Sequence, residues 1–102
     1  MNTTQRSAAP NRGVTTNYLQ FSQASWASLQ ESSRNHGVDM AQAIKAFNSL
    51  HVYGCYIETN TWASRMQADM HVGSGYFRLS ARVDTTHEMP IVLACSLEPR
   101  VA

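Results

Sequence analysis

The chain has 102 residues, of which 43% are apolar and 15% charged, and its formal net charge is +1. This length suits one ordinary domain rather than two, and the near-zero net charge excludes a strong general attraction to nucleic acid or to an anionic membrane. Two cysteines are too few for a disulfide framework and no apolar run reaches the length of a membrane span, so we expect a cytoplasmic protein that does not bind membranes.

The N-terminal segment is polar and has no apolar periodicity. It is rich in Asn, Thr, Ser, Ala and Pro and carries Arg6 and Arg12. Because such a composition cannot bury enough apolar surface to offset the entropy of ordering, we predict a flexible arm over residues 1–13 and a single domain over 14–102. From Asn17 to Phe21 apolar and polar residues alternate, which predicts a short, half-buried strand.

Two helices are predicted next. Ser22 is placed to cap a helix that runs to about Asn35, Gly37 provides a stop, and Asp39 can cap the second helix. Apolar residues recur at helical spacing in both segments. They are Trp26 and Leu29 in the first helix and Met40, Ala43, Ile44, Phe47 and Leu50 in the second.

After the second helix the apolar period changes from 3.6 to 2, which predicts strands. A short alternating run, Tyr53, Cys55 and Ile57, ends at a turn formed by Asn60-Thr61. Two longer runs follow, and Gly73-Ser74-Gly75 supplies the hairpin turn between them. The inward face of the first run holds Trp62, Ser64, Met66, Ala68, Met70 and Val72, and that of the second holds Phe77, Leu79, Ala81 and Val83.

The last predicted strand, Ile91 to Leu97, follows a loop from Thr85 to Pro90 and is apolar on both sides near its start. Such a strand is expected in the centre of a sheet or under a cover, not at a free edge. Short connections favour neighbouring antiparallel strands. We therefore predict an α+β fold with a short N-terminal strand, two helices and a four-stranded antiparallel β-meander packed against the helices.

One third of the chain resembles the ribbon-helix-helix family of DNA-binding proteins. The resemblance is carried by Leu19-Gln20-Phe21-Ser22, Trp26, Leu29, Glu31, Arg34, Gly37-Val38-Asp39-Met40 and Ile44-Lys45. It implies a homodimer whose paired strands enter the DNA major groove, as in a transcriptional regulator. By this resemblance Thr16, Tyr18 and Gln20 would face the bases, while Leu19 and Phe21 would enter the core.

A second interpretation places the Thr16–Phe21 strand in one continuous sheet with the meander, a layout similar to cystatin-like and other helix-on-sheet folds. The outward side chains of the hairpin would then bind a macromolecular partner, a protein or a nucleic acid. The candidate partner-binding residues are Arg65, Tyr76, Arg78 and Arg82. Asp69 and Asp84 can pair with these arginines, which is the common outcome on an exposed face. This interpretation predicts a small non-enzymatic binding protein, such as an inhibitor or adaptor, acting through this face or an oligomer interface.

Signals for chemistry are weaker. His51, Cys55, His71 and His87 lack the spacing of a metal site, and Gly73-Ser74-Gly75 lacks the following helix of a phosphate-binding loop. Paired carboxylates with acid–base spacing are also lacking. We therefore predict no metal, no cofactor and no enzymatic activity. A third alternative is a small-ligand-binding helix-on-sheet domain, with Trp62, Met66 and Met70 lining an apolar pocket under the helices.

Overall fold

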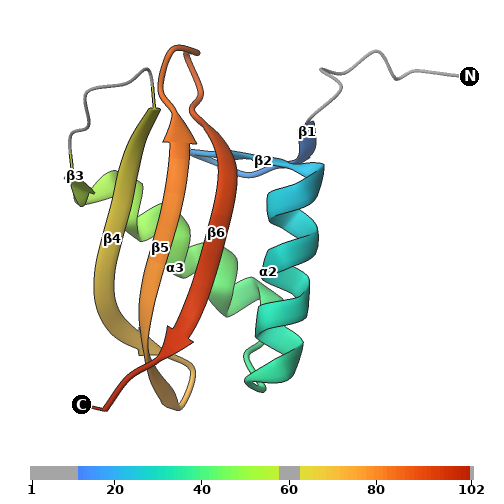
Figure 1. Ribbon diagram of the computed structural model, residues 1–102, viewed down its shortest axis with the longest axis vertical. Coiled ribbons are helices and arrows are strands. Elements are labelled where there is room, and N and C mark those ends of the chain that lie inside the picture. Colours follow the sequence, from blue (N-terminus) through green and yellow to red (C-terminus); the bar gives the residue numbers. More distant parts are fainter. Residues whose placement is uncertain (1–11, 58–62, 102) are drawn as a thin grey trace, which may run out of the picture.

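The computed structural model describes residues 12–57 and 63–101 and has an α+β fold (Figure 1). Two helices lie on one face of a six-stranded mixed sheet with the strand order β1-β2-β6-β5-β4-β3. The elements are β1 (Arg12–Thr15), β2 (Gln20–Ser22), α2 (Gln23–Asn35), α3 (Met40–Val52), β3 (Tyr56–Ile57), β4 (Ala63–Val72), β5 (Gly75–Asp84) and β6 (Ile91–Pro99).

The predicted helix starts are both correct, but only one is capped by a side chain. The Ser25 N–H donates to Ser22 Oγ at 3.1 Å, which is the expected N-cap bond. Asp39 stands at the N-cap of α3, yet its side chain makes no capping bond. Its main-chain carbonyl instead accepts the first helical hydrogen bond, from Ala43 at 3.0 Å. Gly37, at φ 66°, turns the chain between the two helices as predicted.

The hairpin of β4 and β5 is confirmed. Its strands pair without interruption from Ala63 opposite Asp84 to Val72 opposite Gly75, and Gly73 in the turn has φ 62°. Strands β3 to β6 form the predicted antiparallel meander. β3 is shorter than the alternating run suggested, because Tyr53 is the C-cap of α3 and Gly54, at φ 68°, turns the chain after it. The predicted turn Asn60-Thr61 and the predicted core residue Trp62 lie outside the described residues.

The prediction of a purely antiparallel four-stranded sheet is wrong. β2 joins the sheet beside β6 in parallel, with Gln20 opposite Ile91 and Phe21 opposite Val92, and β1 adds a further strand beyond β2. This places β6 in the interior of the sheet, as its two-sided apolar start predicted. β1 begins at Arg12, so the last two residues of the predicted arm belong to a strand, whereas residues 1–11 lie outside the described part.

The core lies between the helices and the sheet. Phe21 and Phe47 are fully buried and meet edge to face at 6.4 Å between ring centroids, a favourable aromatic geometry. Most of the remaining core comes from the apolar stripes predicted for α2, α3, β4 and β5. Neither described helix is long and apolar enough to cross a membrane.

Candidate functional site

The side chains of β4, β5 and β6 that point away from the helices form one surface, which we call the outer sheet face. The odd-numbered residues of β5 from Phe77 to Val83 are buried, so the residues between them point outward. The pairing register adds their neighbours from β4 and β6. The outer sheet face consists of Arg65, Gln67, Asp69, His71, Tyr76, Arg78, Ser80, Arg82, Ala94, Ser96 and Glu98.

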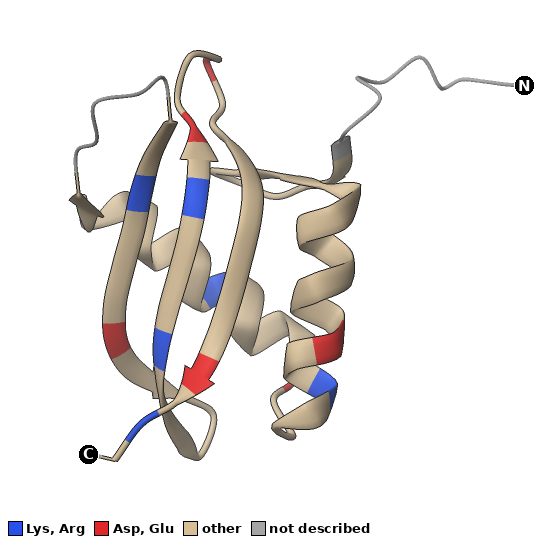
Figure 2. Cartoon of the chain, viewed as in Figure 1, with Lys and Arg blue, Asp and Glu red and all other residues tan. Residues whose placement is uncertain are grey.

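The four residues predicted to bind a partner therefore share one face, but they differ in their surroundings. Arg65 and Arg82 are direct cross-strand neighbours. Figure 2 shows them as two blue bands on the upper parts of β4 and β5. Together with Ser80, Ala94 and Ser96 they line a shallow hollow of about 270 Å³. Like charges directly opposite each other repel, so this pairing is unfavourable for the sheet by itself. It places two positive charges side by side, next to small side chains.

Arg78 is engaged within the chain. Its Nε donates to Asp69 Oδ1 at 2.8 Å and one terminal nitrogen donates to Oδ2 at 3.3 Å, so the pair is bidentate. The hydrogen bond and charge of Arg78 hold the pKa of Asp69 below its ordinary value, and the positive charge of Arg100 contributes. Figure 2 shows this pair as adjacent red and blue bands on the lower part of the sheet. The anticipated Arg–Asp pairing is thus present at Arg78.

Tyr76 also has a neighbour on the same face. Its ring lies 4.8 Å from the imidazole of His71, the residue opposite it on β4. Asp84, the second carboxylate considered for pairing, accepts hydrogen bonds at Oδ1 from the Thr86 N–H at 2.9 Å and the Thr86 hydroxyl at 2.6 Å. These bonds hold the pKa of Asp84 below its ordinary value. Asp84 therefore fixes the start of the loop between β5 and β6.

The three residues predicted to contact DNA bases differ in their hydrogen bonds and exposure. The Thr16 hydroxyl lies 2.9 Å from both Leu19 O and Asn48 Oδ1, and the Gln20 side-chain amide donates to Met89 O at 2.9 Å. Only Tyr18 is substantially exposed, at 48%. At Gln20 and Phe21 both edges of β2 pair within the chain, with β1 and β6. The DNA-binding interpretation needs this strand to pair with a second chain, and it stays a prediction.

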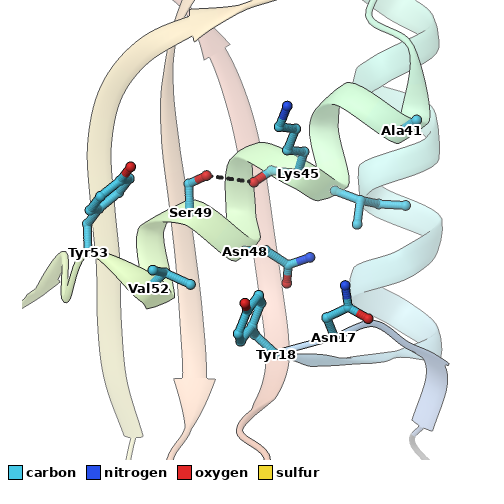
Figure 3. A pocket seen from close by; sticks show the side chains of 9 residues that line it. Asn17, Tyr18, Ala41, Lys45, Asn48, Ser49, Val52 and Tyr53 are labelled. Carbon is cyan, nitrogen blue, oxygen red and sulfur yellow. Dashed lines mark hydrogen bonds between the residues drawn. The ribbon is translucent and has the colours of Figure 1, made fainter.

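A hollow of about 310 Å³ lies where the turn before β2 meets α3 (Figure 3). Tyr18 stands on one side, Lys45 and Ser49 follow the helix, and Val52 and Tyr53 close its end. Tyr53 and Val52 are 80% and 54% exposed. Sequence reasoning missed this surface, since α3 was judged only by its buried stripe.

Two further hollows lie side by side between β4 and α3, and we call them together the β4–α3 groove. They share Ser49 and Met70. One is lined by Ser49, Leu50, Tyr53, Cys55, Ala68 and Met70, and the other by Gln42, Lys45, Ala46, Ser49, Met70, His71, Val72 and Gly73. Met66, which was proposed to line a ligand pocket, is fully buried core, whereas Met70 does line the groove.

The residues considered for metal or nucleophilic chemistry are dispersed. His51 Nδ1 lies 2.7 Å from the hydroxyl of Tyr56, whose pKa is raised by burial. Burial raises the pKa of the Cys95 thiol to about 12, so this thiol stays protonated near neutral pH and is a poor nucleophile. Within residues 12–57 and 63–101, no three His, Cys, Asp or Glu side chains gather as a metal site would need.

Comparison of the chain with protein families, with curated proteins and with solved structures gave no match. The case for any function therefore comes from the geometry of this chain. Two surfaces offer the most: the outer sheet face around Arg65 and Arg82, and the β4–α3 groove.

Proposed function

We propose that this chain is a small non-enzymatic binding protein that receives an acidic segment of a protein partner on its outer sheet face. The observation that carries the proposal is the direct cross-strand placement of Arg65 and Arg82. Cβ atoms of such neighbours lie about 5 Å apart, so two positive charges lie close together on this part of the face and attract a carboxylate of the partner. Guanidinium groups bind carboxylates in a bidentate manner, which favours arginine over lysine in this role.

The neighbours of the arginine pair support this function. Ser80, Ala94 and Ser96 are small and uncharged, so they leave space for a carboxylate above the strands. Farther along the face, Arg78 is neutralised by Asp69, and Glu98 adds a negative charge. The positive charge of the outer sheet face is therefore concentrated at one end, around Arg65 and Arg82, and an acidic segment would bind there.

The proposal is tested with a fluorescein-labelled peptide of alternating Glu and Ser, whose binding is followed by fluorescence anisotropy. Arg65→Glu should abolish binding, because it replaces a positive charge of the site with a negative charge that repels the acidic peptide. Lys45→Glu on α3 makes the same change in net charge on the opposite side of the sheet, and it should bind normally. Equal affinity of wild type and Arg65→Glu would refute the proposed site.

Two further measurements separate binding from folding and define the partner. Arg65→Glu places opposite charges across the strands, so its thermal stability should equal or exceed that of the wild type. Wild-type binding should weaken with added salt, because exposed charges are screened over about 10 Å at 0.1 M. If single-stranded RNA binds in preference to the Glu-Ser peptide, a protein partner is refuted. Solution mass measured on the same samples tests the predicted homodimer.

A further inference from the structure

The outward edge of β4 is paired over only part of its length. β3 has two residues, and these pair with Arg65 and Met66. Figure 1 shows β4 at the margin of the sheet, with β3 beside its upper end only. In the described part of the chain, no strand pairs with this edge from Gln67 to Val72.

The main-chain groups along this edge are available in a regular pattern. The Gln67 N–H donates to the Cys55 carbonyl at 3.1 Å, so residue 67 directs its main chain toward the β3 side. Main-chain direction alternates along a strand. Asp69 and His71 therefore direct their N–H and C=O groups outward from the same edge. An exposed edge of this kind is a template for an added strand.

The β4–α3 groove lies directly beside this edge. Its first hollow, about 260 Å³, lies along Ala68 and Met70, and its second, about 270 Å³, lies along Met70 and Val72. The two hollows are thus displaced by about two residues of β4. Alternate side chains of an extended peptide are separated by about 6.6 Å, which is the same spacing. An added strand would place one side chain in each hollow.

The lining of each hollow defines the side chain that it accepts. The first hollow is walled by Leu50, Ala68 and Met70, which suits an aliphatic side chain. The second contains Lys45, and no acidic residue is among those that line it, while the imidazole of His71 lies on the outer sheet face beside Tyr76. An acidic side chain is the charge complement of the second hollow.

We propose that the open edge of β4 binds an extended peptide of a partner protein as an additional strand. The peptide carries an aliphatic and an acidic residue two positions apart, which occupy the first and second hollows of the β4–α3 groove. Addition of a strand to a sheet edge is a common mode of peptide recognition, in which main-chain bonds supply affinity and side-chain pockets supply specificity. This site lies apart from the outer sheet face, so the two proposals stand or fall separately.

The test uses a labelled peptide, Thr-Leu-Thr-Glu-Thr-Leu-Thr, which offers the aliphatic–acidic spacing in both strand directions. On binding, hydrogen exchange at the amides of Asp69 and His71 should slow, and NMR shifts should follow β4 and α3. Ser49→Phe fills the space shared by both hollows and should abolish binding. Lys45→Glu should weaken binding by about tenfold and should favour a peptide with Lys in place of Glu.

Three controls make the outcome decisive. Arg65→Glu changes the charge of the opposite face by the same amount and should leave the affinity for this peptide unchanged. A peptide with Pro at both central Thr positions loses main-chain donors and should not bind. The proposal is overturned if the peptide does not bind, or if the NMR shifts that it causes lie on the outer sheet face. It is also overturned if the Asp69 and His71 amides are already protected in a concentration-dependent dimer, because a second copy of the chain would then occupy the edge.

Discussion

Two buried serines on α2 predict opposite responses to the same substitution. Ser25 and Ser33 are each 1% exposed. The Ser25 hydroxyl lies 2.8 Å from the Val92 carbonyl of β6 and 3.1 Å from the Ser22 carbonyl. The Ser33 hydroxyl is buried and has no hydrogen-bond partner among the described residues. Ser25→Ala removes a bond that ties α2 to the sheet, whereas Ser33→Ala removes only a buried polar group.

The expected magnitudes follow from these contacts. Loss of a buried hydrogen bond, with a partner left behind, lowers the free energy of unfolding by about 1–2 kcal/mol, which we expect for Ser25→Ala. Burial of a hydroxyl without a partner costs about 1–3 kcal/mol, and alanine is also the better helix former. Ser33→Ala should therefore raise the free energy of unfolding by about 1–2 kcal/mol.

Urea unfolding followed by far-UV circular dichroism measures both effects. The midpoints of the two variants should move in opposite directions while the slope with denaturant stays constant, since neither change alters the surface exposed on unfolding. In thermal unfolding each kcal/mol corresponds to about 4–8 °C. A destabilised Ser33→Ala would mean that its hydroxyl has a partner, and a neutral Ser25→Ala would mean that its bond to β6 contributes nothing. Either result would refute this description of the contact between α2 and β6.

Three further predictions concern the core, an ion pair and a thiol. Phe47→Ala should lower the free energy of unfolding by about 3–5 kcal/mol in urea titrations, because Phe47 is fully buried against Phe21. A loss below about 1 kcal/mol would contradict that packing. Because Arg78 lowers the pKa of Asp69, the stability that their pair contributes is present above pH about 4 and is lost as the pH falls through the folded-state pKa. Arg78→Gln should raise the Asp69 pKa toward its ordinary value in an NMR titration, and an unchanged titration would refute the pairing. Burial raises the thiol pKa of Cys95 to about 12, so in a Cys55→Ser variant this thiol should resist iodoacetamide at pH about 8 until guanidinium unfolds the chain. Mass spectrometry measures the labelling, and rapid labelling of the folded chain would contradict the burial of Cys95.

The elements that depend on local pattern could be predicted from the sequence. Ser22 and Gly37 marked helix ends, and the turn at Gly73 with alternation on both sides marked the hairpin. The parallel pairing of β2 with β6 could not be predicted in the same way. Phe21 and Val92 are buried neighbours, but no periodicity relates residues so far apart in the sequence. The two-sided apolar start of β6 indicated only that some neighbour was needed.

The candidate sites were partly predictable for the same reason. Alternation placed the arginines on one face, whereas the neutralisation of Arg78 depends on the register that brings Asp69 opposite it. The β4–α3 groove was not predicted because it depends on where α3 ends and on how short β3 is. In the part of the chain that the structure describes, α3 continues to Val52 and β3 has two residues, so no strand pairs with the edge of β4 beside small helix residues such as Ala46 and Ser49.

The position of β6 between β2 and β5 has a consequence for the order of folding. The β4–β5 hairpin needs only contacts between nearby residues, so we expect it to form early. β2 pairs with β6 only by closing a loop that contains both helices and the hairpin. During synthesis, the apolar faces of α2 and α3 therefore emerge before β6 is available to complete the sheet. The interval before β6 emerges is when we expect the nascent chain to be most exposed to aggregation and most in need of a chaperone.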